Sequence, residues 1–366
     1  MREEEDRLES DRLGDFPHPR DTARLYGHTR AEAALREAFD GGRMHHAWML
    51  VGREGLGKAT LAYRLARYAL ASEAERAGVA AGSLAVGKDS SAARLIAAEA
   101  HPGLLVIRRQ SEGKRISTQI RVEEVRRLRS FLTLTADEGA WRVVIVDEAN
   151  DMNASAANAM LKSLEEPPLR TLFLLVTPEP GRLIATIRSR CRTIELAPLG
   201  IDDLRLAVRQ ASEATGLEPV AGQEEARLLG LAGGSVRKAL SLKAGGGLEL
   251  YERLLALMRS LPELDVSALH AIADKISAMA EEEAFATFYG LLLDLIARLV
   301  REAVEPGLLL AEEGPLASII RPEKLALWAA LWETIVRDKA EIMALNLDRK
   351  SFVLDTGMRM RALARG

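Results

Sequence analysis

The chain has 366 residues, of which 48% are hydrophobic and 28% charged, a composition typical of a soluble globular protein with two or three domains. Its formal net charge of −3 excludes a general polyanion-binding surface, so any contact with nucleic acid must be local or shared with a partner. Cys191 is the single cysteine, which excludes a disulfide framework and a cysteine-rich zinc module within this chain.

The first 20 residues form a polar lead that begins M-R-E-E-E-D-R and ends F-P-H-P-R. Its charged part predicts a disordered segment or a frayed helix. This lead resembles neither a signal nor a transit peptide, and no apolar run reaches the roughly 18 residues that span a bilayer. We therefore expect a cytoplasmic protein without membrane contact.

A helix predicted at residues 25–39 is followed by a strand, a glycine-rich turn and a second helix. The apolar run at residues 47–51 predicts the strand, and the periodic run at residues 61–71 predicts the helix. Glycines between them allow a tight turn whose N–H groups point inward, and a lysine supplies a positive charge for phosphates. The candidate phosphate-binding residues are Gly52, Gly55, Gly57 and Lys58.

The turn departs from the usual phosphate-loop pattern at one position. Ala59 stands where that pattern has a hydroxyl residue that holds Mg²⁺. Thr60, one place later, is a further candidate nucleotide-binding residue, but it lies about 100° further round the helix, so we do not expect it to replace the missing hydroxyl cleanly. The sequence therefore predicts phosphate binding but not competent metal-assisted hydrolysis.

An Ala-, Gly- and Ser-rich stretch at residues 74–102 predicts two helices and a flexible connection. A short strand at residues 104–107 and an amphipathic helix at residues 120–134 follow. The outer face of this last helix carries Arg126, Arg127 and Arg129. These arginines indicate a solvated surface, with contact to a phosphate backbone as the alternative.

Two carboxylates follow the most clearly buried strand. Four consecutive β-branched residues at positions 143–146 predict a strand of a parallel sheet, with Asp147 and Glu148 at its carboxyl end. Ligands of open parallel sheets bind at that end. Asp147 is the candidate ligand of Mg²⁺, directly or through water, and Glu148 is the candidate to orient an attacking water.

Strands at residues 172–176 and 193–196 bring the number to five. Strands that alternate with helices predict an α/β fold with a doubly wound parallel sheet, which ends near residue 198. After the lead at residues 1–20, we therefore expect a nucleotide-binding domain at 21–198 and a helical lid at 199–245. Residues 246–366 predict an all-helical domain that begins at a glycine hinge.

These segments together resemble the AAA+ clamp-loader family of bacterial DNA polymerase III. The matching runs include H-H-A-W-M-L-V-G-R-E-G-L-G-K-A-T-L-A, V-V-I-V-D-E-A-N-D, L-K-S-L-E-E-P-P, I-R-S-R-C-R and G-G-S-V-R-K-A-L-S-L. The combination of S-R-C with L-K-S-L-E-E-P-P is more specific than either nucleotide motif. The resemblance is dense at residues 25–245 and implies an AAA+ fold with a helical collar as its last domain.

The resemblance implies roles for three further residues. Arg190 is similar to the arginine finger, which acts in trans on the nucleotide of a neighbouring subunit and stabilises charge on the transferring phosphoryl group. Arg237 is similar to the sensor arginine of the lid, which faces the chain's own nucleotide. Thr177, after the strand at residues 172–176, is the candidate for the sensor position on the sheet.

By this resemblance the chain is a clamp-loader subunit that helps to load the sliding clamp on primed DNA. Its own site would bind ATP weakly or without hydrolysis, with Mg²⁺ if metal binds and without zinc. The implied partners are the delta and tau/gamma subunits, with the sliding clamp and primed DNA reached through the complex.

Two alternatives remain, and both are ATPase motors. One is a motor subunit of the tau/gamma type. Such a subunit would be expected to have the Mg²⁺-binding hydroxyl and the zinc cysteines, and this chain lacks both. The other is a stand-alone motor that uses Lys58, Asp147 and Glu148 on its own substrate, against which Ala59 argues. No group of residues indicates nucleotidyl transfer, so a polymerase activity would belong to the holoenzyme.

Overall fold

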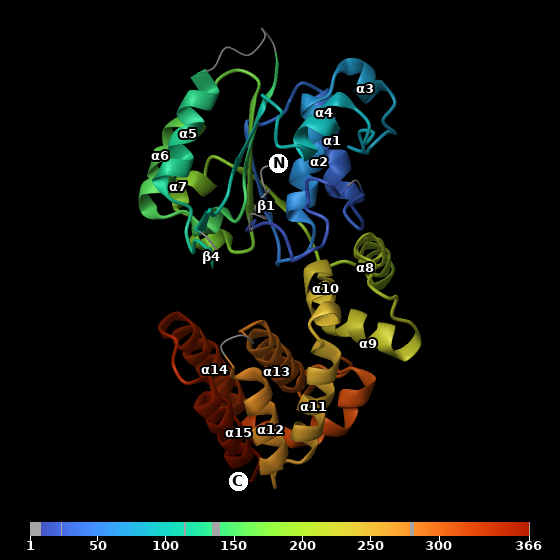
Figure 1. Cartoon of the computed structure of the whole chain (residues 1–366), viewed down its shortest axis with the longest axis vertical. Helices are drawn as coiled ribbons and strands as arrows, with labels where there is room; N and C mark the ends of the chain where they lie inside the picture. The colour runs from blue at the N-terminus through green and yellow to red at the C-terminus, as the bar shows by residue number, and fades with distance from the viewer. Residues whose placement is uncertain (1–8, 23, 113–114, 134–139, 279–281, 366) are drawn as a thin grey trace, which may run out of the picture. The chain divides into compact units, whose positions relative to one another are not determined.

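The computed structural model describes residues 9–22, 24–112, 115–133, 140–278 and 282–365 (Figure 1). Its contacts divide the chain into two compact units. Residues 1–219 and 233–238 form the first unit, and residues 220–232 and 239–366 form the second.

The first unit is built on a five-stranded parallel sheet with the strand order β2-β5-β6-β1-β7. Every residue of the central strand β6 is buried, as expected for a strand covered on both faces. The strands are β1 (Ala47–Val51), β2 (Leu104–Ile107), β5 (Arg142–Val146), β6 (Thr171–Thr177) and β7 (Arg192–Glu195). The predicted doubly wound parallel sheet is confirmed.

Helices cover both faces of this sheet (Figure 1). Alternate residues of β5 point to opposite faces, so Val143 and Ile145 join one hydrophobic cluster while Val144 and Val146 join the other. The first cluster includes α1 (Thr29–Asp40), α2 (Lys58–Leu70) and α4 (Ser91–Ala97), and the second includes α5 (Val122–Thr133), α6 (Ala154–Glu165) and α7 (Ala185–Arg188). Outside the two clusters lie α3 (Glu73–Ala77) and a short hairpin of β3 (Ser111–Glu112) and β4 (Arg115–Ile116).

The polar lead is ordered from residue 9, which contradicts the prediction of a disordered segment or frayed helix there; residues 1–8 lie outside the described part. Asp11 bonds the Arg108 guanidinium at 3.1 Å and lies 2.9 Å from the His18 ring. The Arg67 guanidinium donates to the carbonyls of Arg20 and Thr22 at 2.7 and 2.8 Å. These contacts hold residues 9–22, the N-terminal segment, against α2 and the end of β2.

The predicted lid at residues 199–245 is divided between the two units. Helix α8 (Ile201–Thr215) belongs to the first unit, whereas α9 (Gly222–Ala232) and most of α10 (Val236–Ala244) belong to the second. Leu228, Leu231 and Leu242 share one hydrophobic cluster with the helices that follow. A separate lid domain therefore stays a prediction.

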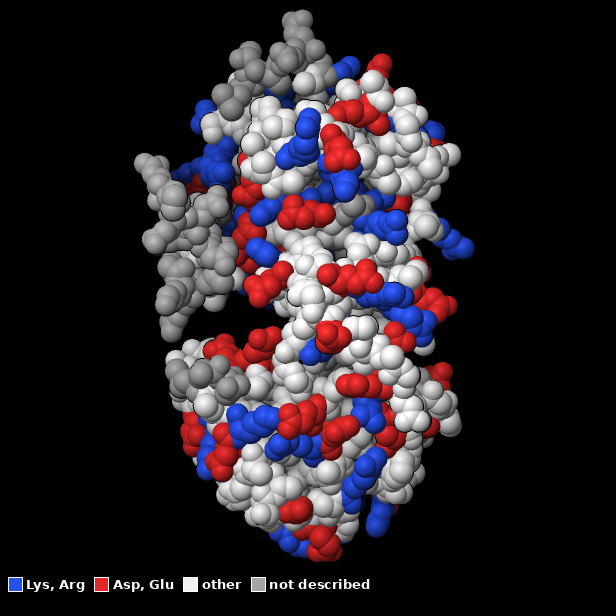
Figure 2. All heavy atoms as spheres, turned by 45° about the vertical axis from the view of Figure 1, so that its right-hand side comes forward, with Lys and Arg blue, Asp and Glu red and all other residues white. Residues whose placement is uncertain are grey.

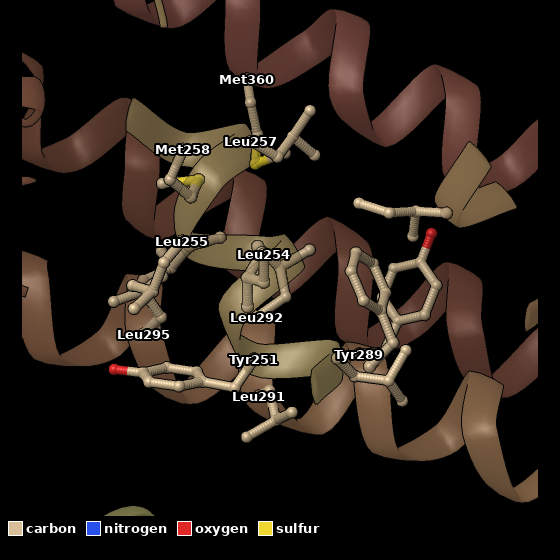
Figure 3. Close-up of a cluster of buried hydrophobic side chains, with 14 of the residues drawn as sticks. Tyr251, Leu254, Leu255, Leu257, Met258, Tyr289, Leu291, Leu292, Leu295 and Met360 are labelled. Atoms are coloured by element: carbon tan, nitrogen blue, oxygen red, sulfur yellow. The ribbon is translucent and has the colours of Figure 1, made fainter. Parts of the chain in front are cut away.

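The described residues of the second unit form helices joined by turns, without a strand, which agrees with the all-helical domain predicted at residues 246–366. Side chains of α11 and α13 share its core, where Leu254 lies beside Leu292 (Figure 3). Its main helices are α11 (Gly247–Arg259), α12 (Val266–Ile276), α13 (Glu282–Glu302), α14 (Leu325–Leu345) and α15 (Arg349–Arg365), with a 3₁₀ segment at Ala311–Ile319.

Charges of both signs are interspersed on the face shown in Figure 2, and no broad area there carries a single sign. Such mixing agrees with the small net charge of −3. Among the described residues, no helix combines the length and the apolar character needed to cross a bilayer.

Candidate nucleotide site

The sheet brings most of the predicted nucleotide-binding residues to one edge. Val51 at the end of β1 lies opposite Thr177 at the end of β6, and Val146 at the end of β5 lies opposite Leu175. The turn after β1 and the acidic pair after β5 therefore meet at the carboxyl edge of the sheet. This is where an open parallel sheet binds its ligands.

The turn requires glycine at positions that include 55 and 57. Gly55 and Gly57 have φ angles of 78° and 89°, in the left-handed region that glycine adopts without strain. A Cβ atom on Gly55 would lie 2.3 Å from the Ser235 hydroxyl and 2.6 Å from the Cβ of Arg237. The start of α10 therefore packs directly on the turn.

Lys58 is turned back on the loop that precedes it. Its buried amine donates hydrogen bonds to the carbonyls of Gly52 and Arg53, both at 2.7 Å. Burial lowers the pKa of Lys58, while Asp147, Glu54 and Glu148 oppose this effect. A phosphate would have to compete with the two carbonyls for the amine.

Arg237 lies beside the turn, and its sensor role stays a prediction. Its Nε atom is 2.8 Å from the carboxylate of Glu54, a residue of the turn. Beside it, the Val236 N–H donates to the Gly55 carbonyl and the Ser235 hydroxyl to the Glu54 carbonyl, each at 2.9 Å. Ser235, Val236 and Arg237, around the start of α10, thus bind the turn through successive contacts.

Asp147 and Glu148 occupy different electrostatic environments. Burial, with Asp11 and Glu148 nearby, raises the pKa of Asp147 to about 8, although Lys58 and Arg109 act in the opposite direction. Burial also raises the pKa of Glu148, which is ion-paired with Arg109. Glu148 is therefore held by a neighbouring cation within the same chain.

Thr177 and Thr60 differ in their surroundings. The fully buried Thr177 hydroxyl donates to the Asn150 amide oxygen at 3.0 Å and accepts the Glu179 N–H at 3.1 Å. Thr60 is half-buried in the first turn of α2, one place past Ala59. The sensor role of Thr177 and the nucleotide-binding role of Thr60 stay predictions.

The donor set for Mg²⁺ at this edge is small. Ala59 contributes no side-chain oxygen, and Glu148 is ion-paired with Arg109. Asp147 is therefore the remaining candidate ligand for Mg²⁺. The described residues contain no group of three or more His, Cys, Asp or Glu side chains that could hold a metal ion. The residues fit a metal held mainly by a bound triphosphate and Asp147.

Arg190 does not lie at this edge. Arg190 lies two residues before Arg192, the first residue of β7. Arg192 pairs with Trp48 near the start of β1, so Arg190 lies toward the amino end of the sheet. Strand β1 has five residues, about 15 Å of extended chain, between this end and the turn. The structure therefore separates Arg190 from the other predicted site residues.

Sequence reasoning missed the partners that hold these residues. Arg108 and Arg109 contact Asp11 and Glu148, and Asn150 contacts Thr177. Arg108 and Arg109 directly follow β2, so their position at the carboxyl edge was a signal that could have identified them.

Comparisons with known proteins show a family to which this chain is similar. The family model described as "DNA polymerase III, delta subunit" matches residues 27–200. DNA polymerase III subunit delta' of Pseudomonas aeruginosa is 35% identical over 238 residues, which are 65% of this chain and 68% of that protein. The Escherichia coli subunit delta' is 31% identical over 335 residues, 89% of this chain and 92% of that protein. A solved DNA polymerase III gamma subunit-related protein of Thermotoga maritima aligns with 93% of this chain and 100% of its own, at 18% identity and a TM-score of 0.41.

Proposed function

Because the chain belongs to the DNA polymerase III delta' family of clamp-loader subunits, we propose that it supplies Arg190 in trans to ATP bound by a neighbouring subunit. Its own site binds ATP weakly and does not hydrolyse it. In the cytoplasm, together with delta and tau/gamma subunits, it helps to load the sliding clamp on primed DNA.

The observation that carries this proposal is the separation of Arg190 from the chain's own phosphate turn. Arg190 precedes β7 at the amino end of the sheet, while Lys58 follows β1 at the carboxyl end. An arginine side chain reaches about 6–7 Å, which is less than half the length of the intervening strand. A phosphate bound at Lys58 is therefore out of reach, and a phosphate on another chain is the alternative target.

The chemistry expected of Arg190 is electrostatic. A planar, permanently charged guanidinium can donate two parallel hydrogen bonds to phosphate oxygens. Charge that spreads over the γ-phosphoryl oxygens in the transition state is then stabilised without any proton transfer. This role requires an exposed guanidinium, and the Arg190 side chain is 34% exposed.

Three features support a weak site in the chain itself. The Lys58 amine already bonds two carbonyls of the turn, and Ala59 offers no oxygen to Mg²⁺. The Arg109–Glu148 ion pair also occupies the carboxylate that would orient water. Nucleotide would have to displace these contacts before it could react.

ATP hydrolysis by the reconstituted loader, with sliding clamp and primed DNA, tests the proposal. We expect Arg190→Ala to lower the stimulated rate roughly tenfold or more, since a finger arginine contributes much of the rate at the site it serves. We expect Lys58→Ala to leave the rate within about twofold, and the isolated chain to be inactive.

Arg188→Ala is the matched control, because Arg188 lies exposed on α7 and the described part of the chain gives it no ion pair. Its loader should match the unmodified one. If instead the isolated chain hydrolyses ATP, Lys58→Ala abolishes this activity and Arg190→Ala changes nothing, the chain is a motor and the proposal is wrong.

A further inference from the structure

We propose that Glu165 is a positioning residue that holds the Arg190 guanidinium in the orientation in which it meets a neighbour's phosphate. This inference rests on the proposed finger role of Arg190 and adds a second residue to it. Glu165 is the last residue of α6, in the run L-K-S-L-E-E-P-P.

Two short contacts within the chain restrain the Arg190 side chain, and a longer one joins its Nη1 atom to the Ser189 hydroxyl at 3.5 Å. Its Nη2 atom lies 2.7 Å from the Glu165 carboxylate. Its Nη1 atom donates to the carbonyl of Thr186 on α7 at 2.8 Å. The guanidinium is therefore held from two directions, by the end of α6 and by α7.

These contacts leave part of the guanidinium available. Arginine has five N–H donors in one plane. The Nε donor has no hydrogen bond within the described residues, and the short contacts to Glu165 and Thr186 use one donor on each terminal nitrogen. The side chain remains 34% exposed, so an anion can approach its remaining donors. The arrangement anchors one edge of the cation and presents another.

Anchoring matters because arginine has many rotamers. A free side chain loses this freedom when it binds a phosphate, which weakens the contact it makes in the transition state. A carboxylate that already restrains the guanidinium reduces this loss, as preorganised groups do in general. The carbonyl end of α6 adds its partial negative charge at the same place.

The ion pair contributes little to folding. Glu165 is 47% exposed and Arg190 34% exposed, and ion pairs of this kind have small effects on stability. Glu165→Ala should therefore fold normally and can be assembled into a loader. Glu166→Ala is the matched control, because the neighbouring Glu166 is exposed and has no ion pair within the described residues.

The test measures kcat and KM for ATP in the reconstituted loader, with sliding clamp and primed DNA present. We expect Glu165→Ala to lower kcat about three- to tenfold with little change in KM, because the interaction is made in the transition state. Glu165→Gln keeps an acceptor oxygen and should recover part of the rate. Glu166→Ala should have no effect.

A double-mutant cycle separates positioning from a general structural effect. In an Arg190→Ala loader, Glu165→Ala should cause no further loss of kcat. Three results would overturn the inference. Glu165→Ala could lower kcat equally with and without Arg190, it could raise the rate, or Glu166→Ala could lower kcat as much as Glu165→Ala does. If Arg190→Ala lowers the rate and Glu165→Ala does not, the inference alone fails; if Arg190→Ala has no effect, the finger role fails.

Discussion

Replacement of Glu313 by alanine is expected to lower the free energy of unfolding by about 3–5 kcal/mol, the usual result of breaking a buried ion pair. Glu313 is fully buried in the second unit and pairs with Arg298, whose Nε lies 2.9 Å from its carboxylate. The Tyr251 hydroxyl and the Leu310 N–H donate to the same carboxylate at 2.6 and 3.0 Å. Its removal deprives the partly buried Arg298 cation of this partner and leaves two donors without an acceptor.

Urea unfolding of the full chain, followed by circular dichroism, measures this loss. Glu252→Ala is the matched control, because Glu252 pairs with Arg227 at 2.7 Å in the same unit but is 62% exposed. We expect it to cost less than about 1 kcal/mol. Equal midpoints for the two variants would show that the buried pair does not stabilise the helical unit.

Four of the five strands could be predicted closely because helices cover both faces of the sheet, whereas the edge strand β7 is largely exposed and begins one residue before the predicted range 193–196. A strand between two helical layers has no polar face, so it appears in the sequence as an uninterrupted apolar run. The runs at residues 47–51 and 104–107 coincide with β1 and β2. Those at 143–146 and 172–176 lie within β5 and β6.

Helix starts were harder to place, because local sequence decides them less strongly. The first helix was predicted from residue 25, but α1 begins at Thr29 after His28. His28 is buried and its ring bonds the Leu56 carbonyl at 2.7 Å, while Leu25 lies against Gly57. Contacts with the phosphate turn thus keep residues 25–28 out of the helix.

The site could be located from the sequence, but its internal contacts could not. Glycine, lysine and acidic residues after apolar runs identify the carboxyl edge of the sheet. The state of each group depends on partners distant in the chain: Arg237 pairs with Glu54, and Glu148 with Arg109. Such pairs follow from the three-dimensional arrangement and have no local sequence pattern.

The N-terminal segment shows the same limit most clearly and leads to the last prediction. Asp11 and Arg108 are 97 residues apart, and composition alone indicates disorder around Asp11. Burial by itself would raise the pKa of Asp11, but the His18 hydrogen bond and the charges of His18 and Arg108 lower it to about 2. The folded chain therefore favours the ionised carboxylate.

Asp11→Asn is expected to lower the free energy of unfolding by about 2 kcal/mol at pH 7. A carboxylate whose pKa is depressed by folding stabilises the protein above its unfolded pKa, near 4. This contribution disappears as the pH falls from about 4 to 2. The difference between the variant and the unmodified chain should thus be present above pH 5 and vanish as the pH falls through about 2.

Urea unfolding at several pH values measures this difference, with Asp15→Asn as the control. Asp15 lies in the same segment but is exposed, without an ion pair in the described residues, so it should have little effect at any pH. A pH-independent loss with Asp11→Asn would contradict the ionic origin of the contact. The result also bears on the nucleotide site. Arg108 directly follows Ile107, and the Ile107 carbonyl accepts the Asp147 N–H at 2.9 Å. If Asp11 anchors Arg108, the N-terminal segment secures the end of β2 beside the candidate metal ligand.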